Sequence, residues 1–264
     1  MAEATMVYGR ITLIILGYIL CLFAPTHAAI SKYSEHIAPC PVSEPNFNDC
    51  VKSAWQQVFS LMRVGVKEVG IRKIDPHFVD KMILNQGGDK QAMNLRLTLT
   101  NTTHYGMSNA KVTNVDVIPE KYKFNITFVV PHYNIDGLYD VDGKIILIPV
   151  MGNGHGQTNL TDLRIHWRIQ GEKAIDKAGN RFMKLSKLAI DLKPRKIHFR
   201  FENLFNGNKE LGAMTNTVLN DQADEIFKLM KPNLEDQSSK LMFAFVKRFF
   251  DKNPYTDIFP GVKV

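Results

Sequence analysis

The sequence has few of the residues that disulfide-rich folds and metal centres require, and it has no long run of one charge. Only three of its 264 residues are cysteines, and the formal net charge of +7 is spread over short basic groups. A nucleic-acid-binding surface would need a clustered basic patch with stacking aromatics. We therefore expect no nucleic-acid partner. The scattered lysines and arginines indicate a solvated basic surface, with weak contact to anionic lipid headgroups left open.

Long apolar runs are also missing, apart from one at the N-terminus. Residues 11–24 (ITLIILGYILCLFA) follow Arg10 and precede small residues near Ala28. This order is typical of a secretory signal peptide, and the run is short for a transmembrane helix. We expect residues 1–28 to be removed and the protein to be secreted, with a membrane anchor as the alternative. Residues 29–264 then form a single domain.

Loss of the signal would leave two cysteines, Cys40 and Cys50. In an oxidising compartment such a close pair predicts one disulfide, and a metal or redox site is the alternative. Three Asn-x-Thr sequons follow, each a candidate N-glycosylation site in a secreted protein. They begin at Asn101, Asn125 and Asn159.

Motifs of the common enzyme classes are missing as well. The sequence has no Gly-x-Ser-x-Gly, no His-Glu-x-x-His and no Walker-type phosphate loop, and no cysteine remains as a nucleophile. Four histidines are dispersed through the part of the chain where strands are predicted, without metal-ligand spacing. They are His132, His155, His166 and His198. We expect no metal, no cofactor and no enzymatic activity, and an esterase is the enzymatic alternative.

Residues 137–156 contain two weak signals for ligand binding. Asp140, Asp142 and Gly143 resemble part of a calcium loop, but the first and twelfth ligand positions would fall on leucine and proline. A strand turn at Asp142–Gly143 is the better interpretation. Three alternating glycines from Gly152 to Gly156 resemble a nucleotide loop, but no helix follows to bind phosphate. We predict a flexible hairpin end there.

The hydrophobic pattern changes twice along the chain. Apolar residues at intervals of three and four predict a helix from Asp49 to Gly70, two more over 211–230 and 234–250, and a break at Pro232. Alternation with period two predicts seven antiparallel strands between them. These strands are 95–100, 111–118, 123–130, 143–150, 163–169, 187–192 and 196–201. The order predicts an α+β fold in which a curved sheet rolls around a long helix.

Methionine is frequent at positions predicted to face inward. Because its side chain is flexible and polarisable, methionine suits an irregular apolar space, although a well-filled core is the alternative. The residues concerned are Met62, Met82, Met93, Met107, Met214, Met230 and Met242.

Four segments together resemble the insect juvenile-hormone-binding and takeout family. They are 70–79 (GIRKIDPHFV), 105–117 (YGMSNAKVTNVDV), 137–156 (GLYDVDGKIILIPVMGNGHG) and 203–221 (NLFNGNKELGAMTNTVLND). The resemblance implies a secreted, largely monomeric carrier that is not an enzyme, with a long helix wrapped by a strongly curved antiparallel sheet. It also implies an internal tunnel for a terpenoid hormone or another long apolar molecule.

We expect apolar residues of the first helix, the strands and the 211–230 helix to line this tunnel, with two tyrosines as polar tips. The predicted lining residues are Trp55, Phe59, Met62, Phe128, Val130, Tyr133, Tyr139, Ile145, Leu147, Met214, Val218 and Leu219. A membrane-interacting lipid-transfer protein, using the amphipathic C-terminal helix, is the alternative function. A partner that presents its ligand to a receptor is another.

Overall fold

The computed structural model describes residues 31–86, 93–145 and 148–263. The chain divides into residues 1–31 and residues 32–264, and every described helix and strand belongs to the second of these units. The expected signal peptide, residues 1–28, lies outside the described residues, as does Leu147. Among the helices that are described, none is long and apolar enough to cross a membrane.

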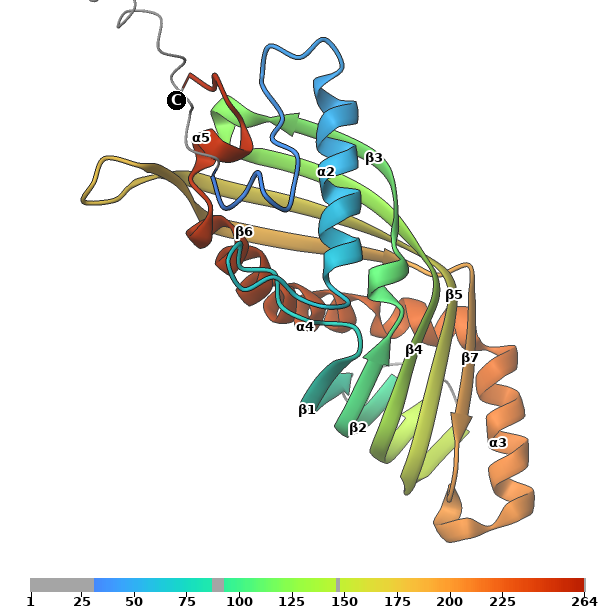
Figure 1. Cartoon of the computed structure of the whole chain (residues 1–264). Helices are drawn as coiled ribbons and strands as arrows, with labels where there is room; N and C mark the ends of the chain where they lie inside the picture. The colour runs from blue at the N-terminus through green and yellow to red at the C-terminus, as the bar shows by residue number, and fades with distance from the viewer. Residues whose placement is uncertain (1–30, 87–92, 146–147, 264) are drawn as a thin grey trace, which may run out of the picture. The chain divides into compact units, whose positions relative to one another are not determined.

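Within the described residues, seven strands form one antiparallel sheet (Figure 1). They are β1 (His77–Gln86), β2 (Met93–Tyr105), β3 (Lys111–Ile118), β4 (Lys123–Ile145), β5 (Ile148–Ile175), β6 (Arg181–Lys193) and β7 (Lys196–Phe201). The strand order is β1-β2-β4-β5-β6, with β3 also beside β4 and β7 also beside β5. The long hairpin of β4 and β5 is therefore common to two halves of the sheet. The β3 half contains β3 and β6, and the β2 half contains β1, β2 and β7.

The side-chain alternation of the hairpin shifts by one residue where the two halves meet. In β4, even-numbered residues from Phe124 to Val130 are buried, whereas odd-numbered residues such as Val141 are buried farther along. The shift lies at Pro131, opposite Asp162 of β5, whose φ of 47° is left-handed. In β2 a register shift next to Asn101, with φ 51°, bends the strand in the same region. The apolar face of the sheet is thus split into two regions.

The helices cover these two regions unequally. They are α2 (Phe47–Leu61), α3 (Lys209–Asp221), α4 (Ala223–Lys252) and α5 (Tyr255–Ile258), with short 3-10 turns at Met107–Asn109, Pro119–Lys121 and Phe205–Gly207. The 30 residues of α4, at about 1.5 Å each, give a helix of about 45 Å that reaches both regions. Its Ile226 packs in the cluster of the β2 half, while Val246 and Phe249 pack with α2 in the β3 half.

Side chains of the helices bond the backbone at exposed strand edges. Asn216 and Asn220 of α3 each accept from a β7 amide and donate to the carbonyl of the same residue, Phe201 and Phe199 respectively, at 2.8–2.9 Å. In this way two carboxamides on one helix face substitute for a further strand. Both asparagines belong to the 203–221 segment that carries the family resemblance.

The edges formed by β3 and β6 have similar partners. Gln56 of α2 donates to the carbonyl of Ala110 and accepts from the amide of Val112, next to β3. On α4, Glu235 and Ser239 accept from amides of β6 at 2.8 and 3.1 Å. The helices therefore position the sheet through specific polar contacts as well as through apolar packing.

The predicted fold class is confirmed, but helix boundaries differ from prediction. The first helix ends at Leu61 rather than at Gly70, since Gly65, with φ 78°, donates back to the carbonyl of Leu61 and closes the last turn. The predicted helix over 211–230 and the predicted break at Pro232 are both wrong, because the chain breaks at Gln222 between α3 and α4, and α4 continues through Pro232. Pro232 is exposed, and Met230 and Leu234 on either side pack on one apolar cluster, which offsets the lost backbone bond.

Residues 142–156 also differ from prediction. Asp142–Gly143 lies inside β4 and not in a turn, and 143–150 is not one strand, since β4 ends at Ile145 and β5 begins at Ile148. The glycines at 152, 154 and 156 lie within β5 and not in a flexible hairpin end. A Cβ at Gly152 or Gly154 would come within 2.9 or 2.7 Å of a backbone oxygen of residues 202–203. Glycine is required there because another backbone segment crosses the strand closely.

Candidate ligand cavity

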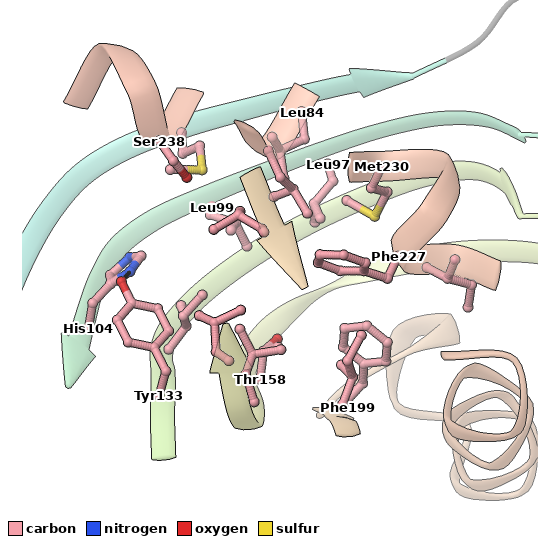
Figure 2. Close-up of a pocket in the computed structure, with 18 of the residues that line it drawn as sticks. Leu84, Leu97, Leu99, His104, Tyr133, Thr158, Phe199, Phe227, Met230 and Ser238 are labelled. Carbon is pink, nitrogen blue, oxygen red and sulfur yellow. Dashed lines mark hydrogen bonds between the residues drawn. The ribbon is translucent and has the colours of Figure 1, made fainter. Parts of the chain in front are cut away.

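A cavity lies between the inner face of the sheet and α4, mainly over the β2 half, and it extends to Ile190 and Leu192 of β6 in the β3 half. The space open to the centre of a water-sized sphere is about 180 Å³. A single buried water needs about 10–15 Å³ by that measure, so the cavity is much larger than a packing defect. The described lining consists mainly of aliphatic, methionine and phenylalanine side chains (Figure 2). Among them are Leu84, Leu97, Leu99, Ile145, Leu160, Phe199, Leu219, Phe227 and Met230.

The described lining contains no Asp, Glu, Lys or Arg. Its polar side chains are His104, Tyr133, Thr158, Trp167 and Ser238. An apolar wall of this kind makes it costly to place a charged ligand inside, because no counter-charge replaces the lost hydration. The wall suits a neutral, elongated apolar molecule.

His104 and Tyr133 form the polar end of the cavity, where Figure 2 shows their polar atoms side by side. The Nδ1 atom of His104 lies 3.0 Å from the hydroxyl of Tyr133, and its Nε2 atom lies 3.1 Å from Oγ1 of Thr102. Burial, and then the charge of nearby His77, lowers the pKa of His104 to about 4. Burial also raises the pKa of Tyr133. Both side chains are therefore neutral at pH 7.

Three of the predicted lining residues border the cavity: Tyr133, Ile145 and Leu219. Val218 borders a separate small void on the α3 side, next to Ile145 and Leu219. Tyr139 is buried outside the lining, where its hydroxyl donates to the carbonyl of Glu202. Met214 is 59% exposed on the outer side of α3.

The structure places the other five predicted residues in the packed core of the β3 half. They are Trp55, Phe59, Met62, Phe128 and Val130. Aromatic rings fill this region: the centroids of Phe59 and Phe128 are 4.5 Å apart, and those of Trp55 and Trp167 are 6.1 Å apart. Because α2 ends early and covers only the β3 half, its apolar stripe does not reach the large cavity.

Sequence reasoning missed the wall that β1 and α4 provide. Leu84 of β1 and Phe227, Leu234 and Ser238 of α4 line the cavity, although none was predicted to bind ligand. The usable signal was methionine. Four of the seven methionines named from the sequence line the cavity, namely Met82, Met107, Met230 and Met242.

The Cys40–Cys50 disulfide is present, with an S–S distance of 2.04 Å. Two of the sequon asparagines, Asn101 and Asn159, are exposed, and Asn125 is half-buried, with its amide 3.3 Å from a carboxylate oxygen of Asp116. Among the described residues, no three His, Cys, Asp or Glu side chains are grouped to hold a metal.

Comparisons with known proteins agree with this geometry. The model of the haemolymph juvenile hormone binding protein family matches residues 19–260. The circadian clock-controlled protein daywake is 23% identical over 84% of this chain and 88% of its own length in Drosophila melanogaster, and 22% identical over 80% and 83% in Drosophila yakuba. The crystal structure of Takeout 1 from Epiphyas postvittana superimposes with a TM-score of 0.75 at 24% identity, covering 84% of this chain and 99% of that one.

The structural likeness extends over the curved sheet and the C-terminal helices, and the family match covers nearly the whole chain. The chain therefore belongs to the haemolymph juvenile hormone binding protein family, whose members bind hydrophobic ligands.

Proposed function

We propose that this protein is a secreted carrier that holds a small apolar molecule, such as a terpenoid or a fatty acyl compound, inside the cavity between the sheet and α4. The observation that carries the proposal is the apolar space of about 180 Å³, which the described side chains leave unfilled. Removing about 300 Å² of ligand surface from water, at about 25 cal/mol per Å², contributes about 7 kcal/mol before entropy losses. That is enough for about micromolar binding.

Secretion is the second part of the proposal. The apolar run of residues 11–24, the Cys40–Cys50 disulfide and the sequons at Asn101, Asn125 and Asn159 all support an extracellular protein. Mass spectrometry of protein expressed in insect cells would test it: the mature chain should begin at Ala29 and carry N-glycans. Retention of residues 1–28 in cell membranes would contradict secretion.

The lipid-transfer alternative relies on residues 243–250 facing a membrane. Three of the apolar residues of that segment, Val246, Phe249 and Phe250, are at most 8% exposed and pack in the core of the β3 half. This burial favours a carrier that holds its ligand without inserting the segment into lipid. Sedimentation with anionic liposomes should leave the protein in the supernatant, whereas salt-sensitive pelleting would support lipid transfer.

Binding can be tested with a matched pair of variants. Leu160 of β5 lines the cavity, whereas Leu138 of β4 is 45% exposed on the outer face. In Leu160→Trp the larger ring occupies ligand space, so we expect at least tenfold weaker binding. Leu138→Trp should bind like the unmodified protein. Native mass spectrometry of delipidated protein with a terpenoid and an acyl compound would measure both.

Equal binding by the two variants would place the ligand elsewhere. Failure of every apolar compound to form a one-to-one complex with the unmodified protein would contradict the carrier function itself.

A further inference from the structure

The hydrogen bonds at the polar end of the cavity form a chain, in which the donor and acceptor of one bond decide the donor and acceptor of the next. Thr102 and His104 lie on β2, and Tyr133 lies on the neighbouring strand β4. Thr102 is 2% exposed and His104 is 6% exposed, so water cannot serve freely as an alternative partner. The carbonyl of Val79 on β1 is the outermost member of the chain, 3.4 Å from Oγ1 of Thr102.

The bond between Thr102 and Val79 determines which atoms donate and which accept in the other bonds. A carbonyl oxygen only accepts, so for Thr102 to make both of its contacts, at 3.4 Å to Val79 and 3.1 Å to His104, its single hydroxyl proton must go to Val79. Its oxygen must then accept from Nε2 of His104, which assigns the Nε2–H tautomer to the neutral ring. Nδ1 of His104 is left without a proton and accepts the proton of the Tyr133 hydroxyl. The Tyr133 oxygen keeps only its lone pairs for a ligand.

The other polar residues of the lining do not require a ligand group that donates a hydrogen bond. The hydroxyls of Thr158 and Ser238 can rotate, so each can donate to a ligand or accept from it. The indole of Trp167 can only donate, but its ring contacts Trp55 and Phe128 in the core of the β3 half. Discrimination between ligand head groups therefore depends on Tyr133.

We propose that the cavity selects an apolar ligand with a hydrogen-bond donor at one end, such as a long-chain or terpenoid alcohol, over one whose head is an ether or ester. The donor bonds the Tyr133 oxygen at the His104 end, and the apolar tail extends toward Phe199 and Phe227 (Figure 2). This selectivity rests on the proposed carrier function. An ether oxygen placed at Tyr133 would face another oxygen with no proton between them, and its desolvation would go uncompensated.

Three ligands of equal size test the proposal: 1-dodecanol, 1-methoxyundecane and tridecane, which have the same number of non-hydrogen atoms. Competition against a fluorescent apolar probe would give their relative affinities. In the unmodified protein we expect the alcohol to bind at least tenfold tighter than the ether. The hydrocarbon should bind no more weakly than the ether, because it has no oxygen to desolvate.

Variants separate recognition from packing. In Tyr133→Phe the ratio of alcohol to ether affinity should fall to about one, with the hydrocarbon little affected. Thr102→Val removes the acceptor for Nε2–H, which frees the His104 tautomer to invert and should also reduce the ratio. Tyr105→Phe, at a tyrosine that is 43% exposed and outside the lining, is the matched control and should keep it.

An ether that binds as tightly as the alcohol to the unmodified protein would overturn the selectivity while leaving the carrier function intact. This comparison needs no variant to fold. If all three compounds failed to bind, both the carrier function and the selectivity would be contradicted.

Discussion

Phe128 and Phe199 are both phenylalanines on strands, yet their surroundings differ. Phe128 is 0% exposed and contacts the rings of Phe59 and Trp167. Phe199 is half-buried and borders the cavity, so one side of its ring has few partner atoms. The contribution of a side chain to stability depends on its contacts, and the same residue type should therefore contribute unequally at these two positions.

Phe128→Ala should lower the free energy of unfolding by about 3–5 kcal/mol, the usual effect of truncating a packed phenylalanine. Phe199→Ala should lower it by less than half as much, since it only enlarges a space that is already present. Urea unfolding followed by circular dichroism would compare the two variants. Equal losses would indicate that the cavity is collapsed in solution.

His104 makes stability depend on pH. Its pKa falls from 6.5 in the unfolded chain to about 4 in the folded one, through burial and then the charge of His77. Between these values the unfolded chain binds a proton that the folded protein does not. Stability is thus complete above about pH 6.5 and decreases by about 1 kcal/mol per pH unit toward pH 4.

Replacement of this residue, His104→Gln, should flatten the dependence measured by urea unfolding between pH 4.5 and 7. The pKa of His77 is also lowered by burial, so some slope should remain. The rings of Tyr133 and Phe245 face this pair, and because burial raises the pKa of Tyr133, neither side chain changes charge in that interval. An unchanged slope in the variant would assign the effect to other groups.

At the scale of elements, the attachment of α3 to β7 depends on two carboxamides. Asn220 accepts from the amide of Phe199 at 2.8 Å and donates to its carbonyl at 2.9 Å. Leucine would fill a similar volume but would leave both backbone groups without a partner. A backbone group left without a partner in a half-buried position lowers the free energy of unfolding by about 1–3 kcal/mol.

Asn220→Leu should therefore speed hydrogen exchange of the Phe199 amide by at least tenfold, as measured by mass spectrometry with peptide resolution. Thr217→Leu, on the exposed side of the same helix, should leave that amide protected. Equal protection in both variants would show that apolar packing alone holds α3 on the strand.

Most strands and the first helix could be predicted from the sequence, whereas the position of the cavity could not. Alternation located segments of six of the seven strands, but β1 was missed because the irregularity of the sheet interrupts its alternation at Asp80–Lys81. The stripe of the first helix, including Trp55 and Phe59, faces apolar surroundings as predicted, but it does not border the cavity that it was expected to line. Which apolar surface stays unfilled depends on where α2 ends and on the path of α4, and no local pattern encodes either.

At the scale of the whole molecule, the disulfide lies far from the ligand cavity. Cys40 and Cys50 belong to the segment before α2 and its first turns, and the amide of Cys40 bonds the carbonyl of Ile258 near the C-terminus. The disulfide thereby fastens both ends of the described domain in the β3 half. The cavity, which lies mainly over the β2 half, has none of these residues in its lining.

Replacing both cysteines by serine should lower the free energy of unfolding by about 3 kcal/mol, as expected for a short closed loop. Ligand affinity should stay within about threefold, since the wall of the β2 half is unchanged. Urea unfolding and native mass spectrometry would give the two quantities on one sample. A large loss of affinity at unchanged secondary structure would mean that the two halves are coupled.

Helix side chains that bond the strand edges also affect whether copies of the protein aggregate at high concentration. A strand whose amides and carbonyls already have partners offers no template for a strand of another copy. With Gln56, Asn216, Asn220, Glu235 and Ser239 in place, the edges formed by β3, β6 and β7 should not exchange strands between copies or build fibrillar polymers at high concentration, which a curved open sheet would otherwise invite.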